Sequence, residues 1–88
     1  MNAEPESGMA AQLRRSANLA WSRARAAQQH SIWLATEIAR TEENVAGTFE
    51  RLARDRPDEA DRLRALAAEA RRFAASERDS AVRMQESE

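Results

Sequence analysis

The turn that decides the fold lies in the stretch LARDRPDEADRL, residues 52–63. Pro57 lacks an N–H and has a fixed φ, so a helix tends to end before it, whereas the first turn of a new helix accepts it. Asp58 and Glu59 follow, and acidic side chains stabilise the positive end of a helix that starts here. The stretch therefore predicts that one helix ends and a second begins near residues 55–57.

The segment before this turn has the periodicity of one long helix. Residues 9–56 contain no proline and a single glycine, Gly47. Small or apolar residues recur at alternating steps of four and three, an average of about 3.5 that matches the a and d positions of a coiled coil. We call these twelve positions the heptad seam: Leu13, Ala17, Ala20, Ala24, Ala27, Ser31, Leu34, Ile38, Thr41, Val45, Thr48 and Leu52. The pattern predicts a helix whose seam packs against a partner helix.

A second amphipathic helix is predicted after the turn, over residues 58–84. The expected fold is all-α, a long helical hairpin that assembles into a four-helix bundle or coiled coil. The alternative is a three-helix bundle, if the first helix breaks at residues 28–31 or at Gly47. We expect one helical domain at residues 9–84, a disordered tail at 1–8 and a frayed end at 85–88. The apolar face of the second helix consists of Leu63, Leu66, Ala67, Ala70, Phe73, Ala74, Ala81 and Met84.

Composition narrows the class of protein. The chain has 88 residues, of which 33% are charged, with 14 basic and 15 acidic residues, a net charge of −1 and no cysteine. Disulfides and thiolate metal sites are excluded, and there is no overall field to attract nucleic acid or a membrane. All basic residues are arginine and alanine is abundant, which indicates a bacterial, high-GC genome. With no recognisable export signal or membrane span, we expect a cytoplasmic protein.

The two predicted helices differ in length. At 1.5 Å per residue the first reaches about 70 Å and the second about 40 Å, so the second covers only part of the first. Residues 9–27 are then left without a partner in the same chain. Burial of the large apolar side chains falls well short of the entropy cost of ordering a lone hairpin. We therefore expect a homo-oligomer, with an antiparallel dimer favoured.

Aromatic and aliphatic residues on α-helical faces mark a candidate partner interface. Trp21 and Ile32 lie about 90° from Leu13 on a helical wheel and widen the apolar stripe, so that the first helix should contact two neighbours. Trp33 lies off the seam, where an exposed indole is typical of a contact surface. We expect Trp33→Ala to weaken association, and Leu34→Ala to lower thermal stability if that position is fully packed. The predicted interface consists of Trp21, Ile32, Trp33, Leu34 and Ile38.

No residue pattern indicates catalysis or a cofactor. His30 is the only histidine, and the Glu-x-x-His spacing of di-iron bundles is absent. The serines have no base at a recognisable spacing, and neither glycine belongs to a phosphate-binding loop. We expect no enzyme, no metal, no cofactor and no small-molecule substrate.

The predicted function is that of a non-enzymatic, self-associating interaction or regulatory module. The alternative is an adaptor whose basic N-terminal half, through Arg14, Arg15, Arg23 and Arg25, binds nucleic acid or an acidic protein. Residues 7–36 contain these four arginines and no acid, whereas residues 37–50 contain four acids. Nucleic acid is disfavoured, because the arginines spread over about half of the helix circumference and no recognition helix follows a tight turn. We favour pairing of the basic half with the acidic stretch of an antiparallel partner.

Overall fold

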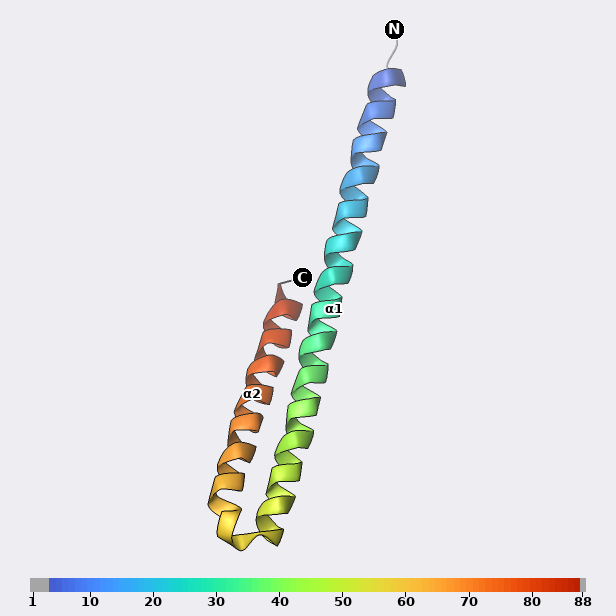
Figure 1. Cartoon of the computed structure of the whole chain (residues 1–88). Helices are drawn as coiled ribbons and strands as arrows, with labels where there is room; N and C mark the ends of the chain where they lie inside the picture. Colours follow the sequence, from blue (N-terminus) through green and yellow to red (C-terminus); the bar gives the residue numbers. More distant parts are fainter. Residues whose placement is uncertain (1–3, 88) are drawn as a thin grey trace.

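Two long helices and a short turn make up the protein. The computed structural model describes the backbone of residues 4–87 and the side chains of residues 8–87. Helix α1 (Glu4–Asp55) is followed by the 3₁₀-helix η1 (Pro57–Glu59) and by helix α2 (Ala60–Glu86), which folds back along α1 (Figure 1). The predicted all-α helical hairpin is therefore confirmed.

The chain reverses direction through one non-helical residue, Arg56. Its φ of −129° and ψ of 78° lie outside the helical region, because the ring of a following proline crowds the helical conformation. Pro57 then occupies the start of η1, where no N–H is needed. The Arg56 N–H donates to the Leu52 carbonyl oxygen at 2.9 Å, and the Glu59 N–H donates to the Arg56 carbonyl oxygen at 3.0 Å. The turn predicted at residues 55–57 is confirmed.

The two helices meet along a stripe of α1 that lies one residue beyond the heptad seam. Ala35, Ala39, Ala46 and Ala53 are buried, and each directly follows a seam position. The heptad seam and this stripe have the same spacing and lie about 100° apart around α1. Helix α2 covers the second stripe and leaves the heptad seam uncovered except at Leu52, which packs beside Ala60 and Leu63. With its half-buried members, this inner stripe consists of Gln28, Ile32, Ala35, Ala39, Glu42, Ala46, Phe49 and Ala53.

Helix α2 meets the inner stripe with a face that is also rich in alanine. Ala46 packs with Ala67 and Ala70, and Phe49 lies against this cluster. Small side chains allow two helix backbones to approach closely, which multiplies the van der Waals contacts between them. The predicted apolar face of the second helix is confirmed except at Phe73, which lies at its edge and is exposed. The buried residues of α2 are Ala60, Leu63, Ala67, Ala70, Ala74 and Ala81.

The N-terminal half of α1 projects beyond the end of α2 (Figure 1). At the junction the Gln28 side-chain amide donates to the Met84 carbonyl oxygen and, at 3.1 Å, to the Ser87 hydroxyl. Residues 8–27, which we call the overhang, are all exposed apart from the half-buried Ala11. The overhang projects about 30 Å, and the molecule measures 87 × 16 × 11 Å. The predicted shortage of intramolecular partners for this segment is therefore confirmed.

The helix boundaries differ from the predicted ones at both ends. Helix α1 begins at Glu4 and not at Met9, because a proline, here Pro5, is compatible with the first turn of a helix. The backbone is thus helical where residues 4–8 were expected to be a disordered tail, and residues 1–3 lie outside the described residues. Helix α1 is also continuous through residues 28–31 and Gly47, so the three-helix alternative is wrong.

At the other end, α2 continues to Glu86, so Gln85 is helical where a frayed end was expected. The Ser87 N–H donates to the Arg83 carbonyl oxygen at 3.2 Å, and the contact with Gln28 also holds this end. Glu88 lies outside the described residues.

Candidate interaction surface

The heptad seam is an uninterrupted stripe on the surface of α1. All of its positions are exposed except Leu52, which is half-buried. Among its large side chains, Leu34 is 42% exposed, Ile38 40% and Val45 37%. Contiguous exposed apolar side chains of this size mark an interaction surface. Their a/d spacing is suited to another helix, and α2 is not that helix because it lies on the inner stripe.

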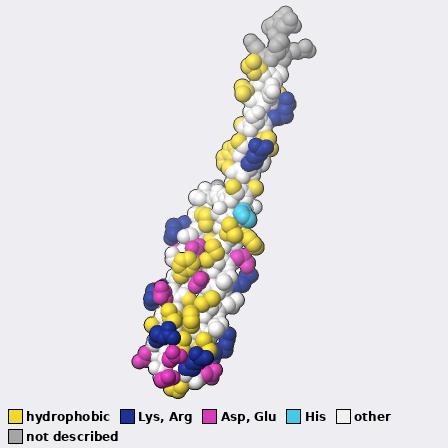
Figure 2. Space-filling view, viewed as in Figure 1, with side chains coloured by type: hydrophobic (Ala, Val, Ile, Leu, Met, Phe, Trp, Pro, Cys, Tyr) yellow, Lys and Arg dark blue, Asp and Glu magenta, His cyan; other side chains and the backbone are white. Residues whose placement is uncertain are grey.

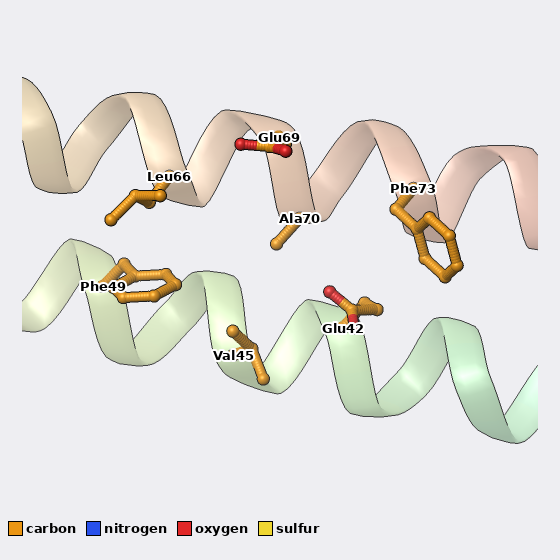
Figure 3. Close-up of a pocket in the computed structure, with 7 residues that line it drawn as sticks. All are labelled: Glu42, Val45, Phe49, Leu66, Glu69, Ala70 and Phe73. Atoms are coloured by element: carbon orange, nitrogen blue, oxygen red, sulfur yellow. The ribbon is translucent and has the colours of Figure 1, made fainter.

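A groove beside the seam adds apolar residues from α2. Figure 3 shows Leu66 above Phe49, and Phe73 extending toward α1 beside Glu42. Phe73 is 49% exposed. On the face in view in Figure 2, hydrophobic side chains gather over both helices of the hairpin, whereas charged side chains crowd the end with the turn. We call this feature the apolar groove; it is lined by Glu42, Val45, Phe49, Leu66, Glu69, Ala70 and Phe73.

Two ion pairs join the helices outside this groove. The Arg71 guanidinium donates to both carboxylate oxygens of Glu50, at 2.5 and 3.3 Å. Arg78 does the same to Glu43, at 2.6 and 3.1 Å. Paired donors of this kind fix the geometry of a carboxylate. The hairpin therefore has charged contacts between its helices as well as an open apolar groove.

These hydrogen bonds shift the ionisation of both carboxylates. The hydrogen bond from Arg78 lowers the pKa of Glu43 below its ordinary value, and that from Arg71 lowers the pKa of Glu50. The carboxylates in turn raise the pKa of the two guanidinium groups. Since all four groups are charged at neutral pH, each ion pair is intact there.

The overhang carries both apolar and basic side chains. Met9, Leu13, Leu19 and Trp21 are all more than half exposed. Its four arginines are exposed as well, and none forms an ion pair with another residue in the range 8–87. They are Arg14, Arg15, Arg23 and Arg25.

The structure distributes the predicted interface residues over three places. Leu34, Ile38 and Trp33 lie together along α1 in a shallow groove. Trp33 is 55% exposed, and its indole stacks on the His30 ring with the centroids 5.8 Å apart. Trp21 lies on the overhang and is 71% exposed. Ile32 belongs to the inner stripe, where it is half-buried beside α2 residues such as Ala81.

The apolar groove contains residues that the sequence did not single out as interface residues. Val45 could have been found, because it belongs to the heptad seam. Leu66 and Phe73 were assigned to the face of α2 that packs within the hairpin. Their position at the edge of that face depends on how α2 is rotated about its axis, which a spacing of 3.6 residues does not define closely.

Neither a metal site nor a membrane segment is found within the part of the chain that the structure describes. Its residues include no group of three or more His, Cys, Asp or Glu side chains placed to hold a metal ion. Neither of its α-helices combines the length and apolar character needed to cross a bilayer. Comparison of the chain with protein-family models, curated proteins and solved structures found no match.

Proposed function

We propose that this protein is a non-enzymatic helical interaction module that self-associates through α1, most simply as a homodimer. The uncovered heptad seam carries the proposal, because a helix with apolar residues at this spacing is stabilised by a second helix. The exposed overhang supports it, since an isolated helix owes most of its stability to packing. The apolar groove offers a second exposed apolar surface beside the seam.

Sedimentation equilibrium at micromolar concentration tests self-association directly. We expect a molecular mass above that of one chain, which falls toward one chain mass on dilution. Circular dichroism of the same samples should show helix throughout. A folded species of one chain mass at every concentration would rule the proposal out.

The overhang arginines support a second candidate function, as an adaptor for an acidic partner. Exposed guanidinium groups that form no ion pair within residues 8–87 are available to phosphates or carboxylates. Binding to duplex DNA and to RNA at low salt tests the nucleic-acid branch, and it should weaken steeply as salt rises. A variant with glutamine at Arg14, Arg15, Arg23 and Arg25 should lose this binding. The charge-matched control has glutamine at Arg51, Arg54, Arg64 and Arg72, all in the hairpin, and should keep this binding.

A further inference from the structure

We propose that the occupant of the heptad seam is a second copy of this chain in antiparallel register, with the overhang of each chain lying along the partner's hairpin. This inference rests on the proposed self-association and specifies its geometry. The two-fold axis of this dimer passes α1 at a point between Ile32 and Trp33. Where the overhang of one chain lies along the hairpin of the other, three helices pack side by side. They are α1 and α2 of the hairpin and α1 of the partner.

Side-chain size along the seam favours this register. Apart from Leu13, the N-terminal half of the seam consists of alanine and serine, whereas the hairpin half is large or β-branched. Helices pack well when large residues face small ones across an interface. In a parallel dimer, alanine would face alanine and the large residues would face each other. The antiparallel register places Leu13 opposite the partner's Leu52, Ala17 opposite the partner's Thr48, Ala20 opposite the partner's Val45, Ala24 opposite the partner's Thr41, Ala27 opposite the partner's Ile38, and Ser31 opposite the partner's Leu34.

The length of the overhang matches the length of the seam that it would cover on the partner. The overhang projects about 30 Å, and the exposed hairpin part of the seam, from Leu34 to Leu52, extends about 27 Å. If two hairpins overlapped fully, both overhangs would protrude without a partner. The register proposed here covers the overhang and the seam together.

Charge provides an independent argument. The overhang has four arginines and no acid, and the register places it against residues 38–57 of the partner, which carry four acids and four arginines. Glu42 and Glu69 line the apolar groove and form no ion pair within residues 8–87. A parallel dimer would bring two sets of four arginines side by side, and like charges across an interface oppose association.

The register also supplies an occupant for the apolar groove. Trp21 precedes Gln28 by seven residues and therefore lies on the α2-facing side of α1. A two-fold axis places corresponding sides of the two α1 helices together. Trp21 would thus lie between the partner's Glu42 and the partner's Phe49, facing the groove. A 71% exposed indole and an open apolar groove would cover each other.

Cysteine cross-linking tests the register, because the chain has no native cysteine. Ala20→Cys and Val45→Cys chains are made separately, mixed, equilibrated and treated with a short bismaleimide. We expect cross-linked dimers from the mixture, since Ala20 faces the partner's Val45. We expect none from either variant alone, because identical positions in the proposed dimer are about 37 Å apart.

The outcomes separate the register from self-association itself. Cross-linking of Ala20→Cys alone indicates a parallel dimer and overturns the register. Absence of any cross-link in samples that sediment as dimers overturns it as well. If the unmodified chain sediments as a monomer, the proposed function fails together with the register.

A matched pair of substitutions provides a second test that does not depend on cross-linking. Ala20 and Ala26 are both exposed on the overhang, but only Ala20 lies on the heptad seam. Ala20→Glu should raise the dimer dissociation constant by more than about tenfold, as expected when a charge without a partner is buried in an apolar interface. Ala26→Glu should change it by less than about twofold. Equal effects of the two substitutions would contradict the register, and neither should disturb folding of the hairpin.

Discussion

At single positions of α1, adjacent residues differ in whether they contact α2 or solvent. Leu34 and Ala35 are adjacent in the sequence, yet Ala35 is buried in the hairpin and Leu34 remains 42% exposed. The same contrast recurs between Ile38 and Ala39. In these two pairs the alanine faces α2 and the larger residue faces solvent, whereas Thr48 is exposed and its larger neighbour Phe49 packs against the α2 alanines.

Ala46 should not tolerate enlargement. It is fully buried beside Ala67 and Ala70, so Ala46→Leu would force the helices apart and destabilise the hairpin by about 1–3 kcal/mol. Thermal and urea unfolding followed by circular dichroism measure this loss. Ala26→Leu on the overhang is the matched control and should leave hairpin stability nearly unchanged. Equal stability of the two variants would show that Ala46 is not tightly packed.

Leu34 and Trp33 should affect association more than folding. The cavity effect expected of Leu34→Ala depends on full packing, and Leu34 is 42% exposed in the hairpin. Trp33→Ala and Leu34→Ala should each leave helix content intact and weaken association by about 2 kcal/mol where the residue is a hot spot. Sedimentation equilibrium and thermal unfolding measure the two properties. If neither variant alters association, the contact surface lies elsewhere on α1.

Glu43 and Glu50 should make hairpin stability depend on pH. Their pKa values are lowered in the folded protein, by hydrogen bonds from Arg78 and Arg71. A carboxyl group with a lowered folded pKa stabilises the fold above its unfolded pKa of about 4.3, and this contribution is lost as pH falls through the folded value. Urea midpoints should therefore decrease with acidification in this range. The Glu43→Gln, Glu50→Gln double variant should show a weaker decrease, and an unchanged pH profile would contradict the assignment.

At the scale of the helices, continuity of α1 depends on the absence of strong breakers between Pro5 and Pro57. Gly47 weakens the helix without ending it, because it adopts no positive φ and sits among better helix formers. The flanking residues supply enough propensity to continue the helix through it.

Gly47→Ala should stabilise the hairpin by about 1 kcal/mol, the difference in helix propensity between the two residues. The added Cβ would lie 3.6 Å from an Arg51 guanidinium nitrogen, which is ordinary van der Waals contact. The melting temperature measured by circular dichroism should therefore increase. Gly8→Ala, at the start of the overhang where the new Cβ would meet no described atom within 4 Å beyond its chain neighbours and the nearby helix backbone, should raise helix content with little effect on the melting of the hairpin. A lower melting temperature for Gly47→Ala would indicate a close contact with α2.

At the scale of the whole molecule, an α1 about twice as long as α2 leaves the overhang exposed, and the position of α2 on the inner stripe leaves the heptad seam exposed. The heptad seam runs along both the overhang and the hairpin. A single partner helix is therefore able to cover the seam along its whole length. We expect the overhang to stay helical only when a partner helix covers it, since exposed helix turns without packing are marginally stable. Hydrogen exchange should show faster amide exchange in the overhang of the dilute chain than in the hairpin. At concentrations that favour association, exchange in the overhang should slow.

The two helices, the turn and the overhang follow from the amino-acid sequence alone. Proline geometry at Pro57 and the 3.5-residue spacing are local properties, and helix lengths follow from residue counts. The pattern also predicted an apolar face broad enough for two neighbours. It did not decide which of two adjacent stripes meets α2, because the heptad seam and the inner stripe have identical spacing. The tertiary structure selected the inner stripe, whose alanines permit close approach of α2 and whose side of α1 aligns Glu43 with Arg78 and Glu50 with Arg71.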